Sequence, residues 1–134
     1  MGDRVTIQVE SGRGTTTIVV KGELDLVTMP VLTELLTLVS REEPGQLVFD
    51  LAGTHFMDCG SARLIASAGR WLPDGRRPVI RHPGAGIRRI LELTGLDAYC
   101  EIQELVVGSN RAWRLARALA SGFVPAREPS GADR

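Results

Sequence analysis

The sequence is poor in lysine and in aromatic residues, and it carries no net charge. Lys21 is its only lysine among sixteen basic residues, which are matched by sixteen acidic residues. A protein without a net electric field has no general attraction for nucleic acid or for an anionic membrane surface. Aromatic residues make up 4% of the chain, too few for a platform that stacks single-stranded nucleic acid. We therefore expect no direct nucleic-acid contact and no membrane contact.

The sequence also lacks long apolar runs and has only two cysteines. No stretch approaches the roughly 18 apolar residues of a transmembrane helix, and no secretory leader precedes the first strand pattern. These absences favour a cytoplasmic protein. Cys59 and Cys100 are expected at opposite edges of a sheet, about one strand length or roughly 17 Å apart. This separation is too large for a disulfide, so we expect both thiols to be free.

A nearly continuous apolar run at residues 47–51 marks the centre of the predicted fold. The run does not alternate with polar residues, which is typical of a strand buried on both faces. We expect a loop over residues 52–57 and then a helix, with Asp58 as its N-cap. Small residues after Asp58 leave the first helical amides open to an approaching group. We call residues 58–61 the shelf.

The periodicity of apolar residues predicts the other elements. Alternation over residues 5–10 and a β-branched run over 15–20 predict an antiparallel hairpin that ends at Gly22. Helical spacing predicts helices over about 28–40, 59–72, 84–94 and 109–120, and short strands over about 78–80 and 100–107. Strands that alternate with helices pair in parallel. We therefore predict one α/β domain over residues 1–122, with a mixed sheet of about five strands and about four helices, and a flexible tail over 123–134.

Three motifs resemble those of a known family. They are Lys21–Asp25, Leu47–Ala62 and Arg88–Asp97, and their order and spacing are similar to those of STAS domains, the family of bacterial anti-sigma-factor antagonists. The resemblance covers roughly residues 5–105 and implies the same α/β fold. It further implies a protein-binding module that docks on an anti-sigma factor and frees a sigma factor for transcription, without catalytic activity and without a cofactor.

The residue after the motif aspartate Asp58 departs from the family pattern. In the family this position is typically a serine that a partner kinase, itself an anti-sigma factor, phosphorylates; here it is Cys59. Gly60 and Ser61 also stand as if exchanged. Without the acceptor serine, we expect that a kinase does not switch this protein off. Ser61 is an alternative acceptor, because the helix N-terminus favours a phosphate there although Asp58 repels it; close packing is the simpler interpretation of this small residue.

The resemblance implies that the partner binds at the shelf and at a neighbouring loop. The implied binding residues are Asp25, Asp58, Cys59, Gly60 and Ser61. Asp25 resembles the aspartate of the family's first loop. It is equally well interpreted as a polar residue that precedes a helix.

Other functions stay open at Cys59. A thiol at a helix N-terminus is favoured as thiolate, so a redox-responsive regulator acting through Cys59 is one alternative, although a free cysteine is often only a small buried apolar residue. A non-switching scaffold subunit of a stress-signalling assembly is another. An enzyme fits less well, because His55 and Cys59 lack a third orienting group. A metal site is not indicated, because no paired ligand spacing is present.

Arginine is concentrated between residues 63 and 89, where Asp74 is the only acid. The arginines that crowd this stretch are Arg70, Arg76, Arg77, Arg81, Arg88 and Arg89. An acidic partner surface or a nucleotide phosphate would suit such a patch. A solvated arginine face is the commoner explanation.

Overall fold

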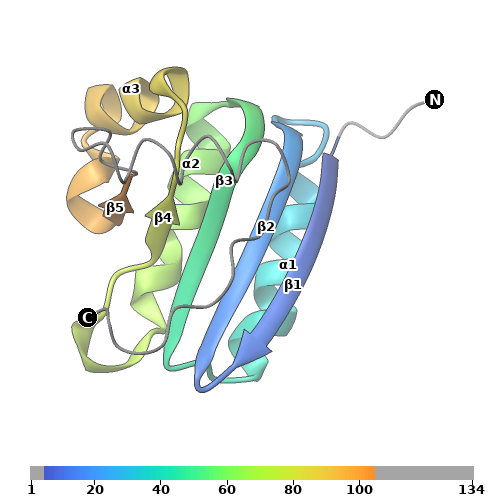
Figure 1. Ribbon diagram of the computed structural model, residues 1–134, viewed down its shortest axis with the longest axis vertical. Coiled ribbons are helices and arrows are strands. Elements are labelled where there is room, and N and C mark those ends of the chain that lie inside the picture. Colours follow the sequence, from blue (N-terminus) through green and yellow to red (C-terminus); the bar gives the residue numbers. More distant parts are fainter. Residues whose placement is uncertain (1–4, 105–134) are drawn as a thin grey trace, which may run out of the picture. The chain divides into compact units, whose positions relative to one another are not determined.

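The computed structural model describes residues 5–104 of the chain. Within this range five strands form one sheet in chain order (Figure 1). β1 and β2 form an antiparallel hairpin, and the later strands are added in parallel. The predicted mixed α/β sheet is therefore confirmed. The strands are β1 (Val5–Gly12), β2 (Thr15–Leu24), β3 (Gln46–Met57), β4 (Val79–Arg81) and β5 (Glu101–Gln103).

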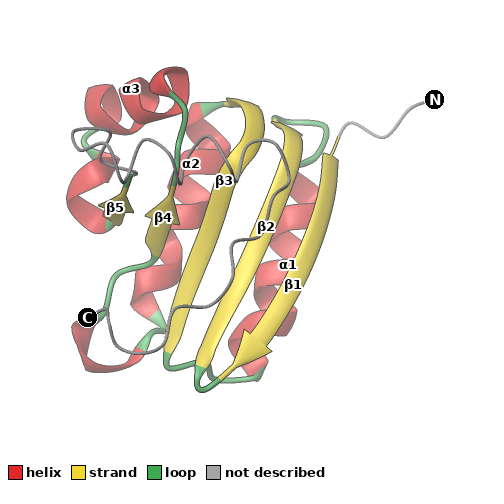
Figure 2. Cartoon of the chain, viewed as in Figure 1, coloured by secondary structure: helices red, strands yellow, loops and turns green. Residues whose placement is uncertain are grey.

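Helices make the connections between the parallel strands. Figure 2 shows α1 and α2 behind the sheet. The helical elements of residues 5–104 are α1 (Met29–Arg41), α2 (Cys59–Ala66), η1 (Ser67–Arg70), η2 (Pro73–Gly75), α3 (Ala85–Thr94) and η3 (Leu96–Tyr99), where η marks a 3₁₀ turn. None of these described helices has the length and apolar character needed to cross a bilayer. The helix predicted over 109–120 and the tail over 123–134 lie outside the described residues.

The hydrophobic core lies between the helices and one face of the sheet. On β2, Ile18 and Val20 are fully buried and alternate with half-exposed neighbours, as expected for a strand with one face in the core. On β3, Leu47, Val48 and Phe49 are buried in succession, as the unalternating run predicts. This packing fixes β2 and β3 against α1 and α2, and with them the edge at which both strands end.

Two predicted strand ends are wrong. The hairpin is predicted to end at Gly22 and residues 52–57 to form a loop, whereas β2 continues to Leu24 and β3 continues to Met57. Only one residue, Asp58, separates β3 from α2. The shelf is therefore attached directly to a paired strand rather than to a loop.

Irregular pairing explains why these strand ends are hard to recognise. The register between β2 and β3 shifts between Val19 and Lys21 and again between Gly22 and Glu23. Gly22 has φ of 113°, a conformation that glycine adopts readily and other residues rarely do. Such bulges break the two-residue alternation that identifies a strand in a sequence. Gly22, which is predicted to end the strand, instead lies within β2 at a point of irregular pairing.

The helix predicted over 59–72 is also shorter than expected. α2 ends at Ala66 and the chain continues as the 3₁₀ turn η1 as far as Arg70. Gly69 has low helix propensity, and 3₁₀ turns are common at the ends of α-helices. In contrast, α3 ends at Thr94 as predicted, and Gly95 follows it as a left-handed C-cap with φ of 75°.

Candidate functional site

The shelf lies at the edge where β2 and β3 end side by side (Figure 1). Leu24 of β2 pairs with Met57 of β3, and the Asp58 amide donates to the Leu24 carbonyl at 3.0 Å. The loop over 25–28 that follows β2 therefore lies beside the shelf. In open α/β sheets the crevice beyond the carboxyl ends of the strands is the usual place for binding.

Asp58 holds the start of α2. It has extended backbone angles, and its Oδ1 accepts a hydrogen bond from the Ser61 amide at 2.8 Å. This is the N-cap geometry that the sequence predicts, and it satisfies one of the free amides of the first turn. The Asp58 carboxylate is therefore engaged within the shelf itself.

Cys59 and Gly60 form the open part of the shelf. Cys59 is exposed, and both Cys59 and Cys100 are free thiols. Gly60 is half-buried against the start of α1, where a Cβ atom would lie 2.8 Å from Cε of Met29. A side chain at Gly60 would have to displace the end of Met29. The beginnings of α1 and α2 therefore approach each other closely at this point.

Ser61 faces the interior rather than the surface. Its side chain is fully buried, and its Oγ has no hydrogen-bond partner among the described residues. A kinase cannot reach this oxygen unless the first turn of α2 moves. The placement agrees with the simpler interpretation of Ser61 as a packing residue.

Asp25 organises the loop beside the shelf. Its Oδ1 accepts hydrogen bonds from the amides of Val27 at 3.0 Å and Thr28 at 3.1 Å. Thr28 directly precedes α1, but its hydroxyl donates to the Glu23 carbonyl at 3.0 Å and caps no helical amide. The side chains of Asp25 and Thr28, at the two ends of the loop, therefore both hydrogen-bond backbone groups of nearby residues.

Three large apolar side chains are exposed at this edge. Leu26 is 77% exposed, Val27 67% and Phe56 50%. We call these residues the apolar rim. These residues are not among the predicted site residues, although Leu26 and Val27 fall outside the helical spacing of α1, which is a usable signal in the sequence. Clustered apolar exposure of this kind is typical of surfaces that bind another protein.

Among residues 5–104, no three His, Cys, Asp or Glu side chains are placed to hold a metal ion. Burial raises the pKa of Cys100 to about 11, with a further rise from Asp97 that Arg77 opposes. Cys100 is therefore a protonated, inaccessible thiol at neutral pH, and Cys59 is the thiol that solvent can reach.

The family can now be assigned. A family model described as Mlab, STAS domain matches residues 7–107. The chain belongs to the STAS domain family. The resemblance carried by the three motifs is confirmed, and the match covers nearly all of the described residues.

Proteins similar to this STAS domain are anti-sigma-factor antagonists. The anti-sigma-F factor antagonist RsfB of Mycobacterium tuberculosis is 27% identical over 95 residues, which are 71% of this chain and 78% of RsfB. The crystal structure of an anti-sigma factor antagonist from Mycobacterium paratuberculosis superposes with a TM-score of 0.68 at 27% identity, over 84% of this chain and 94% of that one. The anti-sigma factor antagonist SpoIIAA in its unphosphorylated form gives a TM-score of 0.64 at 19% identity, over 90% and 100%, and shows the shared fold.

The three motifs occupy different places in this STAS domain. Lys21–Asp25 forms the end of β2 and the start of the loop after it, and Leu47–Ala62 runs through β3 into α2. These two motifs meet at the shelf. Arg88–Asp97 covers most of α3 and its glycine cap, where Ile90 and Leu91 pack against the core. Two motifs therefore build the candidate site, and the third supports the fold.

Proposed function

We propose that this STAS domain is an anti-sigma-factor antagonist that binds an anti-sigma factor and frees a sigma factor for transcription. RsfB and the Mycobacterium paratuberculosis protein, which are similar over most of this chain, are described as antagonists of this kind. The observation that carries the proposal is the exposure of Cys59 beside the apolar rim, at the edge where β2 and β3 end. We assign Asp25, the apolar rim and the first three shelf residues, Asp58 to Gly60, to the partner-binding surface, and leave out the fully buried Ser61.

The roles within this surface follow from its contacts. The apolar rim supplies area that a partner can cover, and burying a leucine or phenylalanine side chain contributes about 1.5–3 kcal/mol. Asp25 and Asp58 hold the loop and the start of α2 through backbone amides. Their contribution to binding is to keep the surface in one conformation, which lowers the entropy lost on association.

A binding experiment tests this surface. The anti-sigma factor is captured with the tagged chain, identified by mass spectrometry, purified and titrated in a calorimeter. We expect Leu26→Asp and Phe56→Asp each to weaken binding at least about tenfold, because each places a charge in an apolar interface. Leu38→Asp is the matched control, since Leu38 is 52% exposed, like Phe56 at 50%, but lies near the far end of α1. Equal weakening by the control, or none by the rim variants, contradicts the assignment.

We further propose that phosphorylation of a serine does not control this binding. Cys59 takes the position of the family's acceptor, and a kinase that positions a hydroxyl would have to transfer phosphate to a larger sulfur. Ser61, the other hydroxyl of the shelf, is fully buried. The activity of such a kinase would then leave the affinity of the protein for its partner unchanged.

Intact-mass measurement after incubation with a kinase-type anti-sigma factor and ATP tests this second part. We expect no stable phosphate on the unaltered chain and one phosphate on Cys59→Ser, with Cys59→Ala as the control that has neither sulfur nor hydroxyl. A stable phosphate within residues 58–61 of the unaltered chain would overturn the proposal.

A thiol-based regulator is the second candidate, favoured by the accessibility of Cys59. Peroxide would oxidise the thiol to a sulfenic acid with release of water, and a reductant would reverse the change. The polar product beside the apolar rim would weaken partner binding. The calorimetric titration, repeated after peroxide and again after reductant, separates the two candidates: a reversible loss that Cys59→Ser abolishes supports the regulator, and unchanged affinity excludes it.

A further inference from the structure

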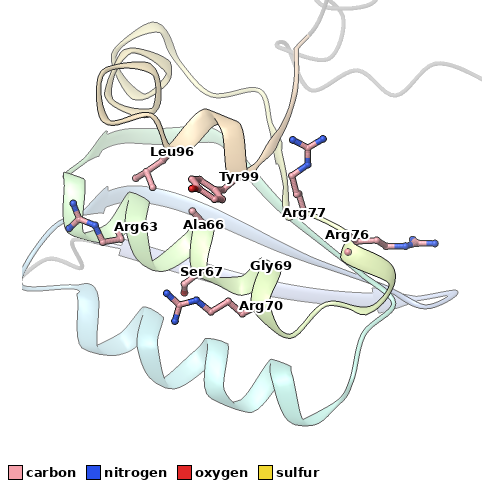
Figure 3. A pocket seen from close by; sticks show the side chains of 10 residues that line it. Arg63, Ala66, Ser67, Gly69, Arg70, Arg76, Arg77, Leu96 and Tyr99 are labelled. Atoms are coloured by element: carbon pink, nitrogen blue, oxygen red, sulfur yellow. The ribbon is translucent and has the colours of Figure 1, made fainter.

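The arginines between residues 63 and 89 do not converge on one ligand. Figure 3 shows Arg63, Arg70 and Arg77 around a pocket of about 420 Å³, with their side chains extending in different directions. The Nη1 group of Arg77 donates to the Ala98 carbonyl at 3.0 Å. All three arginines are exposed, which agrees with the simpler interpretation of a solvated arginine face. The free edge of the sheet is a stronger candidate for a further role.

β1 forms a long and unprotected edge of the sheet (Figure 1). Because β2 is its only neighbour among the described strands, every second residue of β1 directs its backbone N–H and C=O groups away from the sheet. Proteins usually protect such an edge by a short strand, a bulge, a proline or a lysine. β5, at the other edge, has three residues, whereas β1 has eight. These eight include no proline and no lysine, and they pair with β2 without a shift of register.

The face of β1 that continues the core is only partly covered. Ile7 pairs with Val20 of β2, which is fully buried. Val9 pairs with Ile18, which is also fully buried, and yet Val9 itself is 43% exposed. Val5 and Ile7 pack against the core but stay half-buried. A further strand beside β1 would therefore cover apolar side chains as well as free backbone groups.

We propose that β1 pairs antiparallel with β1 of a second copy of this chain, with a two-fold axis at Ile7. Such an interface uses the same surface of both copies, so β1 must be complementary to itself. The axis at Ile7 places Ile7 against Ile7, and Val5 against Val9 of the second copy, so that the apolar residues of both strands share one face. Thr6 then lies against Gln8 on the opposite face. One sheet would continue through both copies, with five strands from each.

The charge of β1 favours this register and a second copy as the occupant. Glu10 is the only charged residue among the eight. A two-fold axis at Glu10 would place two carboxylates directly opposite each other, which destabilises a strand pair. The axis at Ile7 places them on opposite sides of it, roughly 20 Å apart at about 3.4 Å per residue, where salt screens their repulsion. Because the two halves of β1 match each other at this register, no partner of different sequence is needed.

The inference goes beyond antagonist function, because β1 contains no residue of the proposed partner-binding surface. The two-fold axis directs the β2 strands of the two copies in opposite directions. The shelf of each copy follows the ends of β2 and β3, so the two shelves would lie at opposite ends of the joined sheet. A dimer of this kind leaves both shelves open to a partner.

Sedimentation velocity of the full chain at increasing concentration tests the proposal. We expect a reversible equilibrium between monomer and dimer with a Kd below about 100 μM. Val9→Lys should raise this Kd at least about tenfold, because it places a charge against the apolar row of the second copy. Leu93→Lys is the matched control, since Leu93 is 71% exposed on α3 and receives the same charge, and it should leave the Kd unchanged. A chain that stays monomeric at about 200 μM, or equal weakening by the control, would overturn the proposal.

Cysteine substitutions test the register. They are made together with Cys59→Ala, which removes the accessible thiol and leaves the buried Cys100. Ile7→Cys brings two thiols together across the axis, within the roughly 7 Å between Cα atoms that a disulfide requires, so a mild oxidant should produce a covalent dimer. Gln8→Cys is the control, because the Cα atoms at that position would lie roughly 8 Å apart. Circular dichroism verifies that both variants are folded. No covalent dimer in Ile7→Cys, or an equal yield in Gln8→Cys, contradicts the proposed pairing.

Discussion

Replacing Ser61 by alanine should stabilise the protein, although Ser61 lies in the motif that defines the candidate site. Its Oγ is buried and has no hydrogen-bond partner among the described residues. A buried hydroxyl without a partner costs about 1–3 kcal/mol, and alanine is the better helix former by up to about 0.5 kcal/mol. The small void left by the oxygen removes part of this gain. The expected net increase in the free energy of unfolding is about 1 kcal/mol.

Urea denaturation followed by circular dichroism measures this change. The midpoint urea concentration should rise while the dependence of the free energy of unfolding on urea stays the same. The melting temperature should rise by about 3–5 °C for a domain of this size. Ser67→Ala is the matched control, because the Ser67 hydroxyl donates to the Leu64 carbonyl at 2.6 Å. That variant should lose about 0.5–1 kcal/mol. A loss of stability in Ser61→Ala as large as in Ser67→Ala would show that the Ser61 hydroxyl is in fact satisfied, and would refute the reasoning.

Three further stability changes follow from the same structure, each measured by urea denaturation. Asp58→Ala removes the N-cap of α2 and should cost about 1 kcal/mol, whereas Asp58→Asn, which keeps an acceptor oxygen, should cost less than half of that. Gly95→Ala places a side chain at φ of 75° and should cost about 1 kcal/mol. Burial raises the pKa of Cys100 from 9.0 to about 11, so between these pH values the folded state retains a proton that the unfolded state releases. The contribution of this thiol to the free energy of unfolding is fully present below pH 9 and should fall by about 2 kcal/mol as the pH rises to about 11. Cys100→Ala should remove that part of the pH dependence; an unchanged slope contradicts it.

The sequence predicts those features that depend on neighbouring residues. Asp58 is recognisable as an N-cap because its side chain bonds an amide three residues ahead, and Gly95 is recognisable as a C-cap because the left-handed conformation is local. The unalternating run at 47–51 likewise indicates burial, and each of its apolar residues is buried. The fold class follows from these elements and their order.

Features that depend on distant residues are not predictable in this way. Residues 52–57 are a strand because β2 pairs with them across a shifted register, which no local pattern records. The exposure of Phe56 follows from that strand and was missed together with it. The packing of η3 against α2 is a clearer case still, since the two elements are far apart in the sequence.

The short connection between β3 and α2 is held without any contribution from the side chain at position 59. Asp58 is held twice, by its amide to the Leu24 carbonyl and by its carboxylate to the Ser61 amide. Neither bond involves the side chain of Cys59, which points into solvent. A sulfur can therefore take the place of a hydroxyl at this position while the shelf keeps its geometry. Under the proposed function, binding would depend on that geometry and phosphorylation on a hydroxyl at position 59, so the second could be lost without the first.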